Sequence, residues 1–141
     1  MREILFRGQT RRKGEKVWMD GSPVESNWVY GGIFQGGDRS VIYGYDPIEK
    51  YVVYSDTVGQ FTGLTDKNGK KIFEDDIVVI RYETDGEDYS ETKRVHYNAK
   101  ECCWYPMRWE ECCEHCDHYT EVKSIEVIGN IHDNPELLEV E

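Results

Sequence analysis

The sequence has no apolar run long enough for a membrane. Hydrophobic residues make up 38% of its 141 positions, but no run approaches the roughly 20 residues that a membrane-spanning helix needs. The N-terminus also lacks the apolar stretch of a secretory signal, because Arg2, Glu3 and Arg7 bring charge into it. We therefore expect a chain without membrane contact, located in the cytoplasm.

A long amphipathic helix is missing as well. Thirteen glycines separate short β-branched and aromatic stretches, a pattern typical of many short strands joined by turns. No repeat, low-complexity tract or linker divides the sequence, so it predicts a single domain over residues 1–141. We expect a mainly β fold, β-rich α+β at most, in which about eight to ten short antiparallel strands form a barrel- or sandwich-like arrangement.

Positive charge is scarce and unevenly placed. The 17 basic and 28 acidic residues give a net charge of −11, which makes nucleic acid an unfavourable partner because phosphate contacts need clustered cations. Residues 1–16 hold six bases against two acids, a net of +4, whereas residues 110–141 hold one base against ten acids, a net of −9. The basic segment could be a solvated turn, a DNA contact, or a surface that attracts the acidic end of a neighbouring copy, and the overall acidity favours the solvated turn over the DNA contact. The last interpretation favours a homo-oligomer.

Signatures of catalysis are also missing. The sequence contains no glycine-rich phosphate-binding loop and no nucleophile elbow. Glu74, Asp75 and Asp76 precede an apolar run, where adjacent acids more often bind the backbone N–H groups of a turn than form an acid–base pair. His96 and His132 have no evident partners, so we expect both to be solvated. We predict no catalytic and no cofactor-binding residues, and hence a protein that is not an enzyme.

The clearest structural signal that is present is a β-hairpin over Thr65–Lys70. Asn68 and Gly69 tolerate the positive φ that a type I turn followed by a G1 bulge requires. Beyond the hairpin, Ile77–Tyr82 is apolar on both faces, which predicts a central strand covered on both sides. These two elements anchor the prediction of a sheet.

Four further segments carry weaker signals. Glu3–Arg7 alternates and predicts a first strand that Gly8 ends, and two glycines inside Asn27–Phe34 indicate a bulge or a close approach of two backbones. Thr84–Tyr89 is acidic and contains a glycine, so it predicts a loop. Asp133–Leu138 places a proline after capping residues, which predicts one short helical turn.

Five cysteines and two histidines gather within residues 102–118. Cys113 and Cys116 have the two-residue spacing that lets one turn present two thiolates to a structural zinc ion, which further ligands would complete to a tetrahedron. The candidate metal ligands are Cys103, Cys112, Cys113, Cys116 and His118. The alternative is a loop of free, partly buried thiols, because the sequence has only one such pair. An odd cysteine count and a cytoplasmic location argue against disulfides.

Aromatic residues make up 13% of the chain and admit two uses. Single-stranded bases could stack on such side chains. With a net charge of −11, packing within a sheet or a protein interface is the better explanation. The residues concerned are Trp28, Tyr30, Trp104, Tyr105 and Trp109.

Four separated segments, in order along the whole chain, form a distinctive combined pattern. They are Arg2–Gly8, Trp28–Gly31, Val58–Val78 and Glu126–Leu138. Together they resemble the YopX family of phage and prophage proteins in bacteria. The resemblance implies a small, strand-rich protein in the cytoplasm of the bacterial host, with an unknown biochemical role and no residues established as catalytic.

One triplet departs from the family pattern. The family usually has Glu-Gly-Asp before the Ile-Val strand, and this chain has Glu74, Asp75 and Asp76. The departure puts a glycine-dependent positive φ at position 75 in question, although aspartate tolerates that conformation better than most residues. The segment from Tyr82 to Thr120, with the Cys/His cluster inside it, matches no family motif.

The resemblance, the aromatic content and the missing catalytic constellation lead to one expectation of function. We expect a non-enzymatic interaction or assembly protein that self-associates, with a host or phage protein as a further candidate partner. The alternative is a small zinc-binding regulatory or nucleic-acid-associated module that uses the Cys/His cluster.

Overall fold

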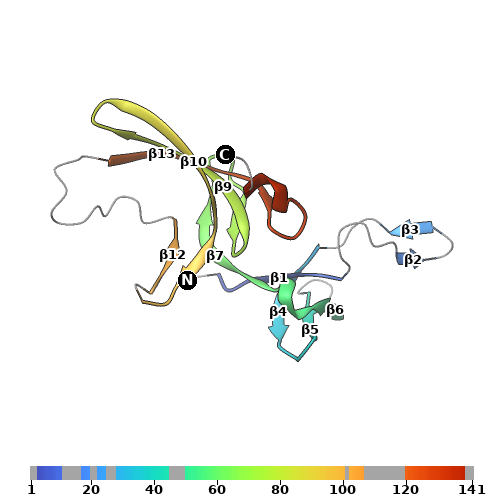
Figure 1. Cartoon of the computed structure of the whole chain (residues 1–141). Helices are drawn as coiled ribbons and strands as arrows, with labels where there is room; N and C mark the ends of the chain where they lie inside the picture. The colour runs from blue at the N-terminus through green and yellow to red at the C-terminus, as the bar shows by residue number, and fades with distance from the viewer. Residues whose placement is uncertain are drawn as a thin grey trace. The chain divides into compact units, whose positions relative to one another are not determined.

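A computed structural model describes residues 3–10, 17–19, 22–24, 28–44, 50–100, 102–106 and 120–138 (Figure 1). The chain divides into two compact units, residues 1–63 and residues 64–141.

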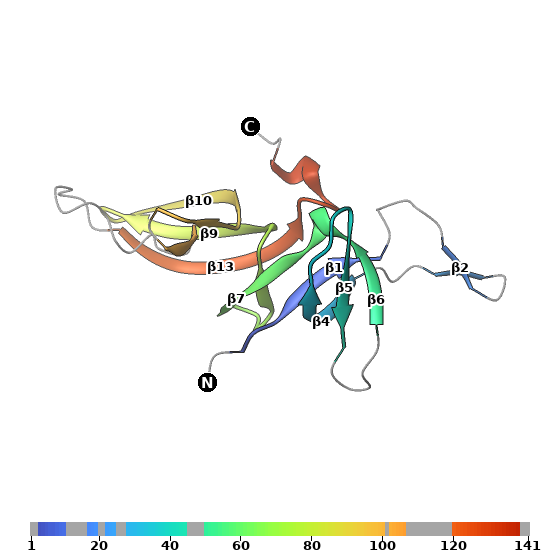
Figure 2. The ribbon, with the colours of Figure 1, turned by 90° about the horizontal axis from the view of Figure 1, so that it is seen from below.

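The first unit is built on an antiparallel sheet. Its elements are β1 (Phe6–Gln9), β2 (Val17–Met19), β3 (Ser22–Val24), β4 (Trp28–Phe34), β5 (Arg39–Tyr43), β6 (Lys50–Tyr54), the 3-10 turn η1 (Ser55–Thr57) and β7 (Gly59–Thr65). The strand order is β6-β5-β4-β1-β7, and β2 and β3 form a separate pair. Figure 2 shows β4, β5 and β6 side by side.

Alternating burial explains why these short strands form a sheet. Ile42 of β5 and Val53 of β6 are fully buried, while their neighbours along each strand are more exposed, as the period of two in a strand requires. In β4, a Cβ atom on Gly31 would collide with the carbonyl oxygen of Tyr43. The prediction of a close backbone approach at the glycine pair is therefore confirmed.

The second unit contains the longest strands. Its elements are β8 (Lys71–Phe73), β9 (Asp76–Thr84), β10 (Glu87–Arg94), β11 (His96–Asn98), β12 (Cys103–Tyr105), β13 (Thr120–Asn130) and the 3-10 turn η2 (Pro135–Leu138). β9, β10 and β13 form an antiparallel sheet in the order β10-β9-β13, and β11 pairs with β12 (Figure 1). The end of β7 continues into this unit, where β8 lies beside it.

The prediction that Ile77–Tyr82 forms a central strand is confirmed. β9 lies between β10 and β13, and Ile77, Val78 and Ile80 are fully buried. Four buried residues make the core cluster of this unit, and partly buried side chains from β9, β12 and β13 pack against them. The buried residues are Ile72, Val78, Ile80 and Val95, and the surrounding ones include Tyr82, Trp104, Ile125 and Val127.

The hairpin between β7 and β8 has the predicted turn. The N–H of Gly69 donates to the carbonyl of Asp66 over 3.0 Å, and the N–H of Asp66 donates to the carbonyl of Lys70 over 2.8 Å. Gly69 has a φ of 80°, as a G1 bulge after a type I turn requires. The turn prediction is therefore confirmed.

Two local predictions were wrong. The first strand is β1, Phe6–Gln9, so it begins later than Glu3 and runs through Gly8. The expected loop over Thr84–Tyr89 is instead a tight turn at Asp85 and Gly86, which both have positive φ, followed at once by β10. Such a turn matches the twist of the strands that it joins.

The prediction of a mainly β fold is confirmed. Thirteen strands lie in the described residues, more than the eight to ten expected, and their sheets are antiparallel and open. The helical turn predicted near Pro135 is η2, and the described elements that are not strands are 3-10 turns. None of the helices in the described ranges is long and apolar enough to cross a membrane.

Candidate functional site

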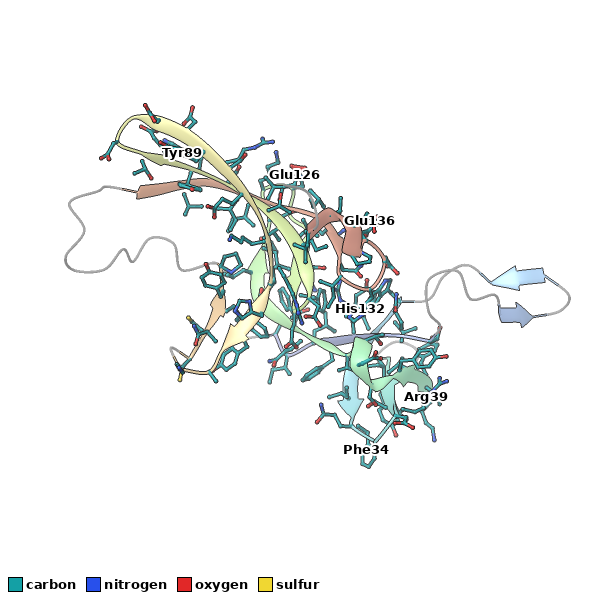
Figure 3. The ribbon with its side chains drawn as sticks, viewed as in Figure 1. Phe34, Arg39, Tyr89, Glu126, His132 and Glu136 are labelled. Carbon is teal, nitrogen blue, oxygen red and sulfur yellow. The ribbon has the colours of Figure 1, made fainter. Side chains whose placement is uncertain are left out.

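The outward face of the first unit's sheet carries an apolar row. In the strand register Phe34 lies opposite Val41, and Val41 lies opposite Val52, so the three side chains share one face. Phe34 is 67% exposed and Val52 is 56% exposed. Figure 3 shows the Phe34 side chain projecting from its strand. We call Phe34, Val41 and Val52 the apolar row.

Polar and aromatic groups flank the apolar row. Toward one end of β5, Tyr43 lies opposite Lys50, and both are exposed. At the other end, the guanidinium carbon of Arg39 lies 3.7 Å from the centre of the Tyr54 ring, a cation–π contact (Figure 3). The face therefore has an apolar middle with one cation at each end.

The apolar row ends at a sheet edge. β6 is the outermost strand in the order β6-β5-β4-β1-β7, and its sequence is Lys-Tyr-Val-Val-Tyr. Edge strands commonly carry charges or prolines that hinder pairing with another chain. β6 has a single charge, Lys50, at its start, so the edge beside Val52 is open to another apolar surface.

A polar hollow of about 570 Å³ lies next to Arg39. Its lining mixes both signs of charge, and the guanidinium of Arg39 already stacks on Tyr54. The lining residues are Gly37, Asp38, Arg39, Tyr54, Ser55 and Asp56. This mixture favours no single class of ligand.

Asp75 is a tightly held acid of the second unit. Its Oδ1 accepts hydrogen bonds from Nε and Nη2 of Arg94 over 2.9 and 2.7 Å, and its Oδ2 lies 3.6 Å from Nε2 of His132. The backbone N–H of Asp75 donates to Val95, and its carbonyl accepts from Ile131. Burial opposes ionisation, but contacts with His132 and Arg94 hold the pKa of Asp75 below its usual value.

The backbone at Asp75 shows whether position 75 has a positive φ without the glycine that the family usually has there. Its φ is 70°, so position 75 keeps a left-handed conformation although aspartate replaces the usual glycine. The prediction that the acidic triplet binds backbone N–H groups holds for Asp76, whose Oδ2 accepts from Phe73 over 2.8 Å. Asp75 instead binds the guanidinium of Arg94 and lies near His132, two side chains that the sequence gave no reason to bring together.

The two histidines differ from each other. His96 is exposed, as expected, and its ring centre lies 5.1 Å from that of Tyr105. His132 was expected to be solvated, but its side chain is only 13% exposed and its Nε2 lies 3.6 Å from Oδ2 of Asp75. Arg94, Asp75 and His132 join the ends of three neighbouring segments. We call this group of three side chains the Asp75 staple, because it connects these segments. None of its three residues lines either of the two hollows on the described surface.

A second hollow of about 520 Å³ lies on the second unit's sheet. Across the three strands, Arg81 of β9 lies opposite both Ser90 and Ser124. The rings of Tyr82 and Tyr89 stack with centres 5.6 Å apart. The lining residues are Arg81, Tyr82, Asp88, Tyr89, Ser90, Lys123 and Ser124. Lys123 is paired with Glu83 at 3.2 Å, so an anion would compete with a carboxylate already present.

One of the five predicted zinc ligands lies within the described residues. Cys103 lies in β12 and is partly buried, opposite Asn98 of β11. The other four candidates, Cys112, Cys113, Cys116 and His118, lie outside the described residues. Within the ranges that the structure describes, no group of three metal-binding side chains gathers. The zinc site therefore stays a prediction.

Two of the predicted aromatic residues, Trp104 and Trp28, take part in packing. Trp104 packs against the core of the second unit and meets Tyr97 edge-on. The guanidinium carbon of Arg7 lies over Trp28, 4.5 Å from the centre of the tryptophan ring. Tyr30 is exposed, and Trp109 lies outside the described residues. Packing within sheets accounts for Trp28 and Trp104 better than base stacking does.

Comparison with known proteins settles the family. Residues 13–139 match the model of the family described as YopX protein. The chain belongs to the YopX family. The resemblance seen in the sequence is thereby confirmed for this YopX chain.

One solved structure is similar to the YopX chain. It is the crystal structure of protein EF1440 from Enterococcus faecalis, 24% identical over 96% of this chain and 98% of that one, with a TM-score of 0.45. A search of curated proteins gave no match.

Proposed function

We propose that this YopX protein is a non-enzymatic interaction and assembly protein whose copies associate through the apolar row of the first unit. The observation that supports this proposal is the row itself, in which Phe34 and Val52 stay largely exposed on either side of Val41. An exposed apolar patch with polar flanks is typical of interaction surfaces.

The energetics of the apolar row favour association. Fully burying a side chain such as Val or Phe contributes about 1.5–3 kcal/mol. In a symmetric contact each copy contributes the same residues, so the gain from Phe34 and Val52 counts twice. The neighbouring edge of β6 adds backbone groups that can pair with another strand.

Charge also favours a second copy over nucleic acid at this surface. Residues 1–63 contain eight bases and eight acids, a net of zero, whereas residues 64–141 contain nine bases and twenty acids, a net of −11. The unit with the apolar row therefore adds no net repulsion between copies. The described residues that flank the row include two bases, Arg39 and Lys50, which are a small cluster for phosphate contacts.

Sedimentation velocity of charge-insertion variants tests the proposal. Val52→Glu places a charge in the middle of the buried contact, so we expect its weight-average mass to fall below that of the wild type. Ile128→Glu is the matched control, because Ile128 is also an exposed apolar strand residue but lies in β13 of the second unit. Circular dichroism of both variants checks that the fold is kept.

Two results would contradict the proposal. One is a wild-type chain that stays strictly monomeric at every concentration measured. The other is a folded Val52→Glu variant with the same mass distribution as Ile128→Glu and the wild type, because the apolar row would then make no contact between copies.

A further inference from the structure

The outer strand of the second unit has a pronounced charge order. β10 (Glu87–Arg94) is the outermost strand in the order β10-β9-β13, and most of its residues are exposed. Its sequence begins with two acids, Glu87 and Asp88, and ends with two bases, Lys93 and Arg94. Figure 3 shows Tyr89 on this outer strand.

The edge of β10 can accept another strand. In an antiparallel sheet, the backbone groups of alternate residues point toward one neighbour and those of the intervening residues point to the other side. The described structure pairs β10 with β9 on one side, and the turn η2 also contacts β10. An outermost strand therefore presents a row of N–H and C=O groups to its open side.

An antiparallel copy of β10 is electrostatically complementary to β10. Reversal of direction brings the acidic beginning of one strand beside the basic end of the other. Opposite-charge pairs directly across an antiparallel ladder are favourable, and like-charge pairs are unfavourable. The strand that best fits this edge is consequently a second copy of the same strand.

We propose that two copies of this protein pair through β10, antiparallel, about a two-fold axis at Ser90. In this register Glu87 of one copy lies opposite the partner's Lys93, and Ser90 lies opposite the partner's Ser90. Tyr89 lies opposite the partner's Glu91. This register gives the two strands their longest overlap with complementary charges, and no like charges lie opposite each other.

Symmetry restricts the register to very few choices. A two-fold axis that relates antiparallel strands stands perpendicular to the sheet, so the residue at the axis must face its own copy. An axis at Glu91 would set two carboxylates against each other. An axis at Tyr89 would set Glu87 against the partner's Glu91. Ser90 is the central position that avoids both repulsions.

The charges of β10 also select against other partners. Charged residues on an edge strand hinder pairing with an arbitrary strand, and like-charge contacts with wrong partners contribute specificity. A strand with the opposite charge order offers partners to Glu87 and Lys93 together. These partners compete with contacts inside the strand, where the hydroxyl of Tyr89 donates to Glu87 over 2.7 Å and Lys93 lies 3.9 Å from Glu91. The net charge of −11 on residues 64–141 opposes close approach, so we expect a weak, reversible contact.

The pairing of β10 deepens the proposed function and rests on it. The apolar row and β10 are separate surfaces, one in each unit. A chain with two different self-complementary surfaces can bind two neighbouring copies at once. Repeated use of both contacts links copies into assemblies larger than a dimer.

Charge reversal in a Val52→Glu background tests the pairing without help from the apolar row. We expect Val52→Glu to remain a reversible dimer, followed by sedimentation equilibrium from about 10 µM to about 1 mM. Adding Glu87→Lys, or adding Lys93→Glu, sets like charges across both symmetric pairs and weakens association by about tenfold. The swap Glu87→Lys with Lys93→Glu restores it.

Mixing the two single-reversal chains gives the most specific result. One chain then carries two cations at positions 87 and 93 and the other carries two anions, so we expect the equimolar mixture to form heterodimers. Lys123→Glu in the same background is the matched control, because Lys123 lies on β13 and the charge change equals that of Lys93→Glu. This control should dimerise like its parent.

Three outcomes would overturn the pairing of β10. They are a folded Val52→Glu chain that stays monomeric up to the highest concentration, single reversals that associate like Lys123→Glu, and a mixture that does not restore association. If the β10 variants have no effect on association but Val52→Glu still lowers the mass, the pairing of β10 is wrong and the proposed contact through the apolar row is retained. The two proposals can therefore fail separately.

Discussion

Asp75 shows how one residue can combine a backbone cost with a compensating set of contacts. A left-handed conformation costs a non-glycine residue about 1–2 kcal/mol, and Asp75 has a φ of 70°. Its carboxylate binds the guanidinium of Arg94 and faces the ring of His132. A glycine would relax the backbone but would give up both contacts, which explains why aspartate can stand here.

Two substitutions at position 75 separate these effects. We expect Asp75→Gly to lower the free energy of unfolding by about 1–3 kcal/mol, because Arg94 and His132 lose a buried carboxylate. Asp75→Ala should cost about 1 kcal/mol more, because alanine has the same loss and also the strained φ. Urea unfolding followed by circular dichroism measures both values.

Asp85 supplies the control for position 75. It also has a positive φ, 52°, but lies in an exposed turn. Asp85→Gly should therefore be neutral or slightly stabilising. Equal stability of Asp75→Gly and Asp75→Ala would show that the backbone conformation carries no cost at position 75.

At the scale of elements, the β7–β8 hairpin depends on one buried carboxylate. Oδ1 of Asp66 accepts from the N–H groups of Asn68 and Lys70, each over 2.9 Å, and Oδ2 accepts from the N–H of Val127 in β13 over 3.0 Å. Burial opposes ionisation, yet these three hydrogen bonds hold the pKa of Asp66 below its usual value. The hairpin is thereby joined to β13.

The lowered pKa values predict a loss of stability in acid. A carboxyl group with a depressed native pKa stabilises the fold fully above its unfolded-state pKa of about 3.9, and this contribution is lost as the pH falls through the native value. We expect the free energy of unfolding in urea to stay level from about pH 6 to about pH 5 and to fall as the pH is lowered further toward about pH 2. Asp66→Asn should be less stable at the upper pH and show a smaller fall.

Asp88→Asn is the comparison for this pH dependence, because Asp88 is an exposed acid of β10. It should follow the wild-type profile. A profile of Asp66→Asn that runs parallel to the wild type would show that Asp66 does not contribute to the acid transition.

Strong local signals identified some elements and missed others. The turn at Asn68 and Gly69 was predictable because its chemistry is contained in a few adjacent residues. β9 was predictable because it is apolar on both faces. β10 was partly mistaken for a loop, since its residues are mainly polar and exposed. Its strand conformation comes from pairing with β9, which no local pattern records.

At the scale of the whole molecule, the chain has two compact units of different charge. Residues 1–63 have no net charge and residues 64–141 carry all of the net −11. Each unit has its own buried apolar residues, Ile42 and Val53 in the first, and Val78 and Ile80 in the second. A buried set in each unit provides a physical basis for separate local unfolding.

Hydrogen exchange of the full chain tests this separation. Val53→Ala should cost about 1–3 kcal/mol by leaving a cavity, and we expect faster exchange of amides in β5 and β6 with β9 unchanged. Val78→Ala is the reciprocal variant and should speed exchange in β9, with β5 and β6 unchanged. The sequence-based prediction of a single domain requires the opposite, namely that either variant lowers protection in both units together.

The candidate sites differ in how much the sequence could say about them. The spacing of the cysteines led to the hypothesis of a zinc site. Four of its five candidate ligands lie outside the described residues, so the site stays a prediction. The apolar row was not recognised, because Phe34, Val41 and Val52 are distant in sequence and local patterning does not tell them from the buried Ile42 and Val53. Their exposure depends on which face of the sheet each residue joins.

Chemistry between near neighbours was enough to establish the mainly β character, the β7–β8 turn, the central strand and the resemblance to the YopX family. Contacts between distant residues established the staple of Asp75 with Arg94 and His132, the apolar row and the open edge of β10. The physical reason is that turn geometry and strand propensity act over a few residues. Strand order and register arise from pairings across the chain, and these decide which side chains meet and which remain exposed.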